Sequence, residues 1–257
     1  MEKIALKSLV ENGLHFGHQT SRWCPKMKPY IWGQKNGVHL IDVSKTARGL
    51  EKSAEFLEQL AREGKSVLWV GTKKPAQEIV KNAAAELGQP FISHRWIGGL
   101  LTNYTQVKKS VSKLLHFEDV LSKSEHFHYT KKELNLFQKI VDRLINNIGG
   151  VRRLKWPVGA VVLVDSSKES TALREANECG VPVIALVDTN SDPSGVDFII
   201  PGNDDSPKSI KFVINYLAAA YRKGKENSKV APVLEQEEIV STSEVDISLS
   251  RLEKIQE

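Results

Sequence analysis

Residues 160–187 read AVVLVDSSKESTALREANECGVPVIALV, and this stretch decides the fold. The runs at 161–164 and 183–187 are apolar at every position, which is typical of strands covered by helices on both faces of a sheet. Between them, the sequence from about Glu169 to Cys179 predicts a helix. A strand, a helix and a second strand in this order predict a parallel βαβ unit.

The same alternation extends through much of the chain. It starts with a first strand at 38–41 and a helix at about 44–63. Further strands are expected at 66–70, 91–92, 160–164, 183–187 and 198–200, and further helices at about 75–87, 169–179 and 207–221. This pattern predicts an α/β fold with a doubly wound, mostly parallel sheet.

Residues 103–148 interrupt the alternation. Leu134, Phe137, Val141, Leu144 and Ile148 follow heptad spacing, and a rougher apolar stripe precedes them. This spacing predicts an inserted antiparallel coiled-coil hairpin of two helices. The alternative is an ordinary helical pair packed on the sheet with a solvated charged face.

Charge is unevenly distributed along the 257 residues, whose net charge is +5. Residues 1–50 and 104–153 each carry five more basic than acidic residues, whereas residues 226–257 carry five more acidic than basic ones. A basic body suggests a polyanionic partner. We hypothesise that the acidic tail discourages binding to unrelated RNA.

These patterns divide the chain into four parts. A basic, aromatic segment is expected at 1–43, an α/β domain at 44–102 and 149–223, the hairpin at 103–148, and a mobile acidic tail at 224–257. The 40% apolar content suffices for a sizeable core and excludes a disordered chain.

Several protein classes are disfavoured by sequence. There is no run of about 18 apolar residues and no secretory leader, so a soluble, cytoplasmic protein without membrane contact is expected. Cys24 and Cys179 form no CxxC pair, which makes a disulfide framework unexpected. Neither GxGxxG nor GxxxxGK[ST] occurs, so no phosphate-binding motif supports an enzyme.

Acidic residues follow two of the expected strands. Asp165 and Asp188 should lie at the carboxyl edge of the sheet, where ligands commonly bind, with Asp192, Asp204 and Asp205 in the following loops. Together with His15 or His18, such a cluster could bind a divalent metal. The alternative is that Asp188, Asp192 and Asp204 cap helices and turns.

Basic and aromatic residues are interleaved near the N-terminus, in GLHFGHQTSRWCPKMKPYIWGQKNGVHLIDV at residues 13–43. Lysine and arginine neutralise phosphates, and Trp23, Tyr30 and Trp32 offer flat faces for bases. These residues point to RNA, although Trp23 and Trp32 could instead pack in the core. A second dense patch, SHRWIGGLLTN, occupies residues 93–103.

Four motifs in order resemble one family. They are the N-terminal stretch above extended through SKT at residues 44–46, SVLWVGTKK, RWIGGLLTN, and ALREANECGVPVIALVDTNSDPSGVDFIIPGNDD. Over nearly all of residues 4–222 the chain resembles the second protein of the bacterial small ribosomal subunit. The resemblance implies a Rossmann-like domain with a protruding coiled-coil hairpin. It also implies a non-catalytic structural role in translation.

The implied partners are small-subunit ribosomal RNA and neighbouring ribosomal proteins, including the large messenger-RNA-binding OB-fold protein. No small-molecule substrate, required cofactor or homo-oligomer is expected. The residues expected to bind RNA are Arg22, Trp23, Lys26, Lys28, Lys35, Lys73, Lys74, Arg95, Lys108, Lys109, Lys131 and Lys132. A divalent metal ion at the carboxyl edge would use His18, Asp188, Asp204 and Asp205, since Ser170 stands where many members have a further histidine.

Two other functions compete with this interpretation. A metal-dependent or phosphate-handling enzyme would use Asp165 and Asp188 at the sheet edge. A protein adaptor would use the hairpin as its docking surface.

Overall fold

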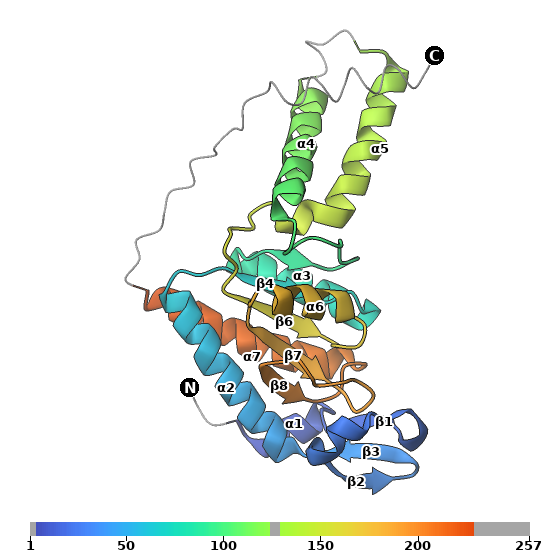
Figure 1. Cartoon of the computed structure of the whole chain (residues 1–257), viewed down its shortest axis with the longest axis vertical. Helices are drawn as coiled ribbons and strands as arrows, with labels where there is room; N and C mark the ends of the chain where they lie inside the picture. The colour runs from blue at the N-terminus through green and yellow to red at the C-terminus, as the bar shows by residue number, and fades with distance from the viewer. Residues whose placement is uncertain (1–3, 124–128, 229–257) are drawn as a thin grey trace.

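The computed structural model describes residues 4–123 and 129–228, which are built around a five-stranded parallel sheet. The strands are arranged in the order β5-β4-β6-β7-β8 (Figure 1). They are β4 (Val67–Val70), β5 (Phe91–Ile92), β6 (Ala160–Val164), β7 (Val183–Val187) and β8 (Phe198–Pro201). Every residue of β4, β6 and β7 is buried, which confirms the α/β class and the expected cover on both faces.

Two layers of side chains cover the sheet because alternate strand residues face opposite sides. Trp69, Val162 and Ile184 share one apolar cluster with residues of α2 (Val43–Arg62), α3 (Lys74–Leu87) and α7 (Pro207–Glu226). Their neighbours Leu68, Val161 and Val183 share the other with residues of α6 (Ser170–Glu178). The sheet is therefore doubly wound.

The C-terminal helix runs farther than its apolar periodicity predicts. α7 continues past Tyr221 to Glu226, and there the ammonium of Lys223 lies 3.3 Å from the Glu58 carboxylate of α2. A polar contact between helices holds this last turn, which hydrophobic spacing alone does not reveal. Residues 229–257, which include most of the expected acidic tail, lie outside the described residues.

The strand expected first in the alternation belongs to a second sheet instead. Val38–Ile41 is β3, the middle strand of an antiparallel sheet ordered β1-β3-β2, with β1 at Phe16–Gln19 and β2 at Ile31–Lys35. The reason is the Asn36-Gly37 turn, whose residues have φ of 54° and 75°. Such a two-residue turn folds β3 back on β2, and the Asn-Gly pair is the sequence signal of this hairpin.

Short helical segments surround this small sheet. They are α1 (Leu6–Glu11) and the 3₁₀ helices η1 (Thr20–Arg22) and η2 (Pro25–Tyr30). They bring much of the basic, aromatic segment beside the carboxyl edge of the main sheet, below β8 in Figure 1.

Two helices, α4 (Tyr104–Ser122) and α5 (Lys131–Ile148), project side by side beyond the side of the main sheet that holds β5 and β4, away from β8 (Figure 1). We call them the helical arm. The rings of Phe117 and Phe137 lie 5.4 Å apart between them. Thr130 and Glu133 form a capping box that starts α5, and η3 (Gly149–Val151) ends it. Coiled-coil packing of the arm remains a prediction.

Among residues 4–123 and 129–228, none of the helices has both the length and the apolar composition needed to span a bilayer.

Candidate functional site

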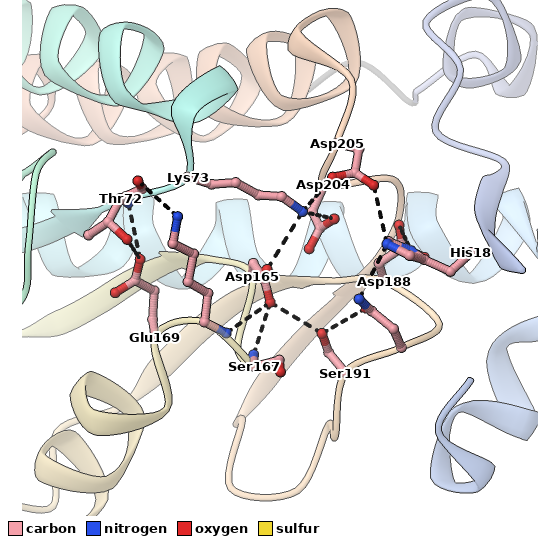
Figure 2. Close-up of polar contacts among 12 residues, drawn as sticks. His18, Thr72, Lys73, Asp165, Ser167, Glu169, Asp188, Ser191, Asp204 and Asp205 are labelled. Carbon is pink, nitrogen blue, oxygen red and sulfur yellow. Dashed lines mark hydrogen bonds and ion pairs between the residues drawn. The ribbon is translucent and has the colours of Figure 1, made fainter. Parts of the chain in front are cut away.

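The carboxyl edge of the sheet holds the predicted pair of aspartates. Asp165 follows β6 and Asp188 follows β7, and because these parallel strands are neighbours, both carboxyl groups lie at the same edge (Figure 2). The two residues are 6% and 1% exposed. Asp165 accepts hydrogen bonds from the backbone N–H groups of Ser167 and Lys168, at 3.0 and 3.1 Å.

A histidine from the small sheet reaches this edge. His18 of β1 places Nδ1 3.1 Å from Asp188 Oδ2 and Nε2 3.2 Å from Asp205 Oδ2. The His18 backbone N–H also donates to Thr189 Oγ1 at 2.8 Å. These contacts join the N-terminal segment to the main sheet.

Lys73 lies in the same cluster rather than on the open surface. It precedes α3, and its ammonium is 2.7 Å from both Asp204 Oδ1 and Asp205 Oδ1 and 3.6 Å from Asp165 Oδ2. Its side chain is only 17% exposed. We call His18, Lys73, Asp165, Asp188, Asp204 and Asp205 the edge cluster.

The edge cluster has perturbed ionisation. Burial, together with the nearby carboxylates of Asp165 and Asp188, raises the pKa of Asp204 to about 7. Burial lowers the pKa of Lys73, but its bonds to Asp204 and Asp205 outweigh that effect and raise it overall. The hydrogen bond to Asp188 raises the pKa of His18, against the opposing effect of burial.

Four members of the edge cluster offer a ligand set for a metal ion. One nitrogen or oxygen each from His18, Asp188, Asp204 and Asp205 lie within 4.8 Å of one another. Asp204 is 0% exposed, and its Oδ2 has no hydrogen-bond partner among the described residues. A buried carboxylate oxygen without a donor is costly, and a cation would satisfy it.

Only part of the capping alternative fits these aspartates. Asp192 closes a turn by accepting from the Ser194 backbone N–H at 2.8 Å. In the neighbouring loop the turn-forming residue is Asn203, which accepts from the backbone N–H groups of Asp205 and Ser206. Asp188 and Asp204 instead face His18 and Lys73, respectively.

The residues expected to bind RNA fall in three places. Arg22, Lys26, Lys28 and Lys35 are exposed around the small sheet. Lys74 and Arg95 are exposed on the main domain, and Lys108, Lys109, Lys131 and Lys132 are exposed on the helical arm. Lys73 is the exception, because its charge is already engaged by carboxylates. Lys26 is also paired, at 2.7 Å from Asp192 Oδ2.

The aromatic residues of the N-terminal segment divide between two environments. Trp23 is half-buried, with its ring 5.3 Å from that of His39. Trp32 of β2 is 76% exposed, so its face is available to a partner. The sequence allowed either packing in the core or exposure to a partner for each tryptophan, but it did not show which applies to Trp23 and which to Trp32.

Two buried glutamates that the sequence did not single out hold the loops of the predicted RNA surface. Glu175 of α6 accepts from Trp96 Nε1 at 3.0 Å and from the backbone N–H groups of Gly99 and Leu101 at 2.8 and 3.1 Å. Glu169 accepts from the Thr72 backbone N–H at 3.1 Å. No local motif marks them, because their partners are distant in the sequence.

Comparison with known proteins identifies the family. The family model for ribosomal protein S2 matches residues 9–224. The chain belongs to the ribosomal protein S2 family. This family is a structural, non-enzymatic component of ribosomes, so the expectation that the chain is not an enzyme is confirmed and the enzyme alternative is wrong.

Curated relatives agree with this membership of the ribosomal protein S2 family. The small ribosomal subunit protein uS2 of Bdellovibrio bacteriovorus is 43% identical over 87% of this chain and 72% of its own length. The uS2 of Chlamydia muridarum is 47% identical over 85% of this chain and 77% of its own length. The uS2 of Dictyoglomus thermophilum is 41% identical over 88% of this chain and 92% of its own length.

Proposed function

We propose that this chain is a structural constituent of the small ribosomal subunit that binds ribosomal RNA and neighbouring ribosomal proteins. The observation that carries this function is the family match over residues 9–224, together with relatives that are small-subunit proteins. Since those relatives are bacterial, the proposed location is the cytoplasm. A single copy would assemble into each subunit.

The proposed RNA surface uses phosphate neutralisation more than base reading. Its exposed residues are those given above for the small sheet, the main domain and the helical arm. Lysine and arginine on phosphates release counterions, so affinity falls steeply with salt. Trp23 is half-buried, so only part of its side chain is open to RNA.

Sedimentation of the native protein tests this function. Co-migration with small subunits at moderate salt is expected, together with binding of the purified protein to small-subunit ribosomal RNA that weakens with added salt. Absence from the subunit fraction, or a flat salt dependence, would contradict the proposal.

A charge-matched comparison tests the N-terminal surface within it. Arg22→Gln, Lys26→Gln and Lys28→Gln together should reduce incorporation into subunits. The control removes three exposed lysines from α2 and α7, as Lys52→Gln, Lys208→Gln and Lys211→Gln. Equal incorporation of both triple variants would remove the N-terminal residues from the binding surface.

The protein partners extend to the large messenger-RNA-binding OB-fold protein of the small subunit. Support for a protein contact comes from Trp32 of β2, which is 76% exposed and offers a large apolar ring to a partner. Pull-down of that OB-fold protein by small subunits carrying Trp32→Ala tests the contact, with the RNA content of the subunits as control. Undiminished recovery would exclude Trp32 from the contact.

A second proposal is that the edge cluster binds one divalent metal ion through His18, Asp188, Asp204 and Asp205. It rests on the partnerless buried oxygen of Asp204. Four carboxylates face one ammonium and one imidazole here, so negative charge remains for a cation to neutralise. Imidazole and carboxylate ligands suit Zn²⁺.

Calorimetric titration of the chelator-treated protein with Zn²⁺ tests this site. One ion per chain is expected for the wild type, and Asp204→Asn should abolish that binding. Asp192→Asn is the control, because Asp192 lies in a turn outside the edge cluster. No heat of binding with wild-type protein, or an unchanged stoichiometry in Asp204→Asn, would overturn the metal proposal.

A further inference from the structure

A recess of about 250 Å³ lies where the helical arm joins the main domain. Residues at the ends of β5 and α5 line it, together with Lys81 of α3 and Arg152 after η3. Ser93 and His94, which begin the dense patch at 93–103, line it, whereas none of the residues individually expected to bind RNA does.

Close backbone packing builds one wall of this recess. A Cβ on Gly150 would lie only 2.2 Å from the Phe91 carbonyl oxygen, so η3 can approach β5 this closely only with glycine at that position. Gly149 also lines the recess, but it has helical φ of −56°, and an added Cβ would meet nothing nearer than Ile145 Cγ2 at 3.5 Å. A larger residue can therefore replace Gly149, whereas at Gly150 it would clash with the backbone of β5.

The lining combines three kinds of group. Phe91, His94 and Ile145 provide rings and apolar surface, and Asn146 and Asn147 provide side-chain amides. Lys81 and Arg152 are positively charged, and no acidic residue is among the lining residues. Arg152 lies 2.5 Å from Glu118, whereas no ion pair is found for Lys81 within residues 4–123 and 129–228.

This combination matches the parts of an unpaired nucleotide. Rings and apolar side chains contact the face of a base, and amides pair with the donors and acceptors of its edge. A lysine free of carboxylate partners neutralises the adjoining phosphate. A purely apolar ligand would leave both the cations and the amides without suitable partners.

The recess is also continuous with the proposed RNA surface. Lys81 lies two helical turns after Lys74 on α3, so the two lysines share a helix face. His94 is followed directly by the exposed Arg95. RNA that contacts Lys74 and Arg95 would therefore pass the mouth of the recess.

We propose that this recess binds one unpaired nucleotide of the small-subunit ribosomal RNA, with the base inside the recess and its phosphate at Lys81. The inference rests on the proposed function and adds a specific binding site to it.

Two variants test the phosphate and the base separately, using full-length protein and purified small-subunit ribosomal RNA. Lys81→Gln should weaken binding and lower the slope of log affinity against log salt by about one, the effect of losing one phosphate contact. Gly149→Leu keeps every charge but adds a bulky apolar side chain to the lining, and it should weaken binding by about tenfold, in the range that one stacked base contributes. Lys211→Gln is the control for Lys81→Gln, and Gly149→Ala is the control for Gly149→Leu. Both controls should bind like wild type.

Ultraviolet crosslinking of native small subunits followed by peptide mapping gives an independent result. A nucleotide attached to the peptide that contains Phe91 or His94 is expected. Thermal melting checks the fold of Gly149→Leu; if that variant unfolds, Lys81→Gln and the crosslink decide.

The outcomes separate this inference from the proposed function. If wild-type protein binds the RNA but the folded variants bind equally well and no recess peptide carries a nucleotide, only the nucleotide site is wrong. A crosslink from the recess to another protein would likewise overturn it. If wild-type protein neither binds the RNA nor enters subunits, the proposed function fails and this inference fails with it.

Discussion

At the scale of single residues, buried carboxylates do most of the positioning at the carboxyl edge of the sheet. Glu175 satisfies three N–H groups of the 96–101 loop, and Glu169 holds Thr72 beside Lys73. Both glutamates are below 10% exposed. Their role is to fix loops whose exposed neighbours, Lys74 and Arg95, are proposed to contact RNA.

Removing Glu175 should destabilise the protein. Glu175→Ala leaves three donors without an acceptor, and each unsatisfied buried group costs about 1–3 kcal/mol, so we expect the free energy of unfolding to fall by about 3 kcal/mol or more. Urea denaturation measures this. Glu178→Ala, at an exposed position of the same helix, is the control. Equal losses in the two variants would show that the hydrogen bonds to Glu175 are not important for stability.

Asp192 should restrain Lys26. Its carboxylate pairs with Lys26 at 2.7 Å, and this hydrogen bond lowers the pKa of Asp192 to about 2. Asp192→Asn keeps an oxygen for the Ser194 backbone N–H but releases the ammonium, so affinity for small-subunit ribosomal RNA should rise severalfold. Filter binding of wild type and variant at matched salt measures the change. Unchanged affinity would mean that Lys26 does not contact RNA.

The ionisation of Glu169 predicts a pH dependence of stability. Burial raises its pKa above 4.5, although the hydrogen bonds from Thr72 oppose the shift. Just above pH 4.5 the folded state thus holds a proton that the unfolded chain has released, and the free energy of unfolding falls as pH rises, by at most about 1.4 kcal/mol per pH unit. Glu169→Gln should flatten the profile there in urea titrations from pH 4 to 7. A profile parallel to that of wild type would contradict this sign.

At the scale of elements, the helical arm carries a basic surface that projects away from the main domain (Figure 1). Leu114, Phe117 and Val141 are buried, which accounts for the pairing of α4 with α5. Lys108 and Lys109 near the start of α4 and Lys131 and Lys132 at the start of α5 stay exposed. The arm can therefore contribute charge to a partner without disturbing the main core.

Removing charge from α5 should lower the salt dependence of RNA binding without unfolding the arm. Lys131→Gln with Lys132→Gln should reduce the slope of log affinity against log salt by about two if each lysine neutralises one phosphate. Circular dichroism should show unchanged helix content, because the capping box of Thr130 and Glu133 is retained. If the slope stays the same, the arm serves a protein partner instead.

At the scale of the whole molecule, the basic excess is spread over distant surfaces. The small sheet and the helical arm lie at opposite ends of the main sheet (Figure 1). Contacts at both ends would let one chain bridge separate parts of a large RNA. The average charge of +5 conceals this arrangement.

The acidic C-terminal residues should limit unspecific binding. Their charge repels RNA, so deletion of residues 229–257 should increase affinity for an unrelated RNA at low salt more than for small-subunit ribosomal RNA. Filter binding with both RNAs measures this difference. Equal affinities before and after deletion would exclude the hypothesis.

The sequence by itself determined the main sheet, its helices and the position of Asp165 and Asp188, because buried strands and amphipathic helices leave local, periodic patterns. The motifs also allowed the family resemblance and the grouping of His18 with Asp188, Asp204 and Asp205. Within 13–43, the Asn36-Gly37 pair encodes the hairpin of β2 and β3 locally, whereas the apolar run of β3 resembles a strand of the main sheet.

Only the tertiary structure decided which charges are available and which are paired. Lys73 and Lys74 are adjacent in sequence, yet Lys73 is enclosed by three carboxylates from two distant loops while Lys74 remains exposed. The hydrogen bonds of Glu175 join segments more than 70 residues apart, and the recess brings residues 145–152 of the arm's end to residues 81–94 of the main domain. Such contacts depend on how separate elements pack together, and no local pattern of residues encodes them.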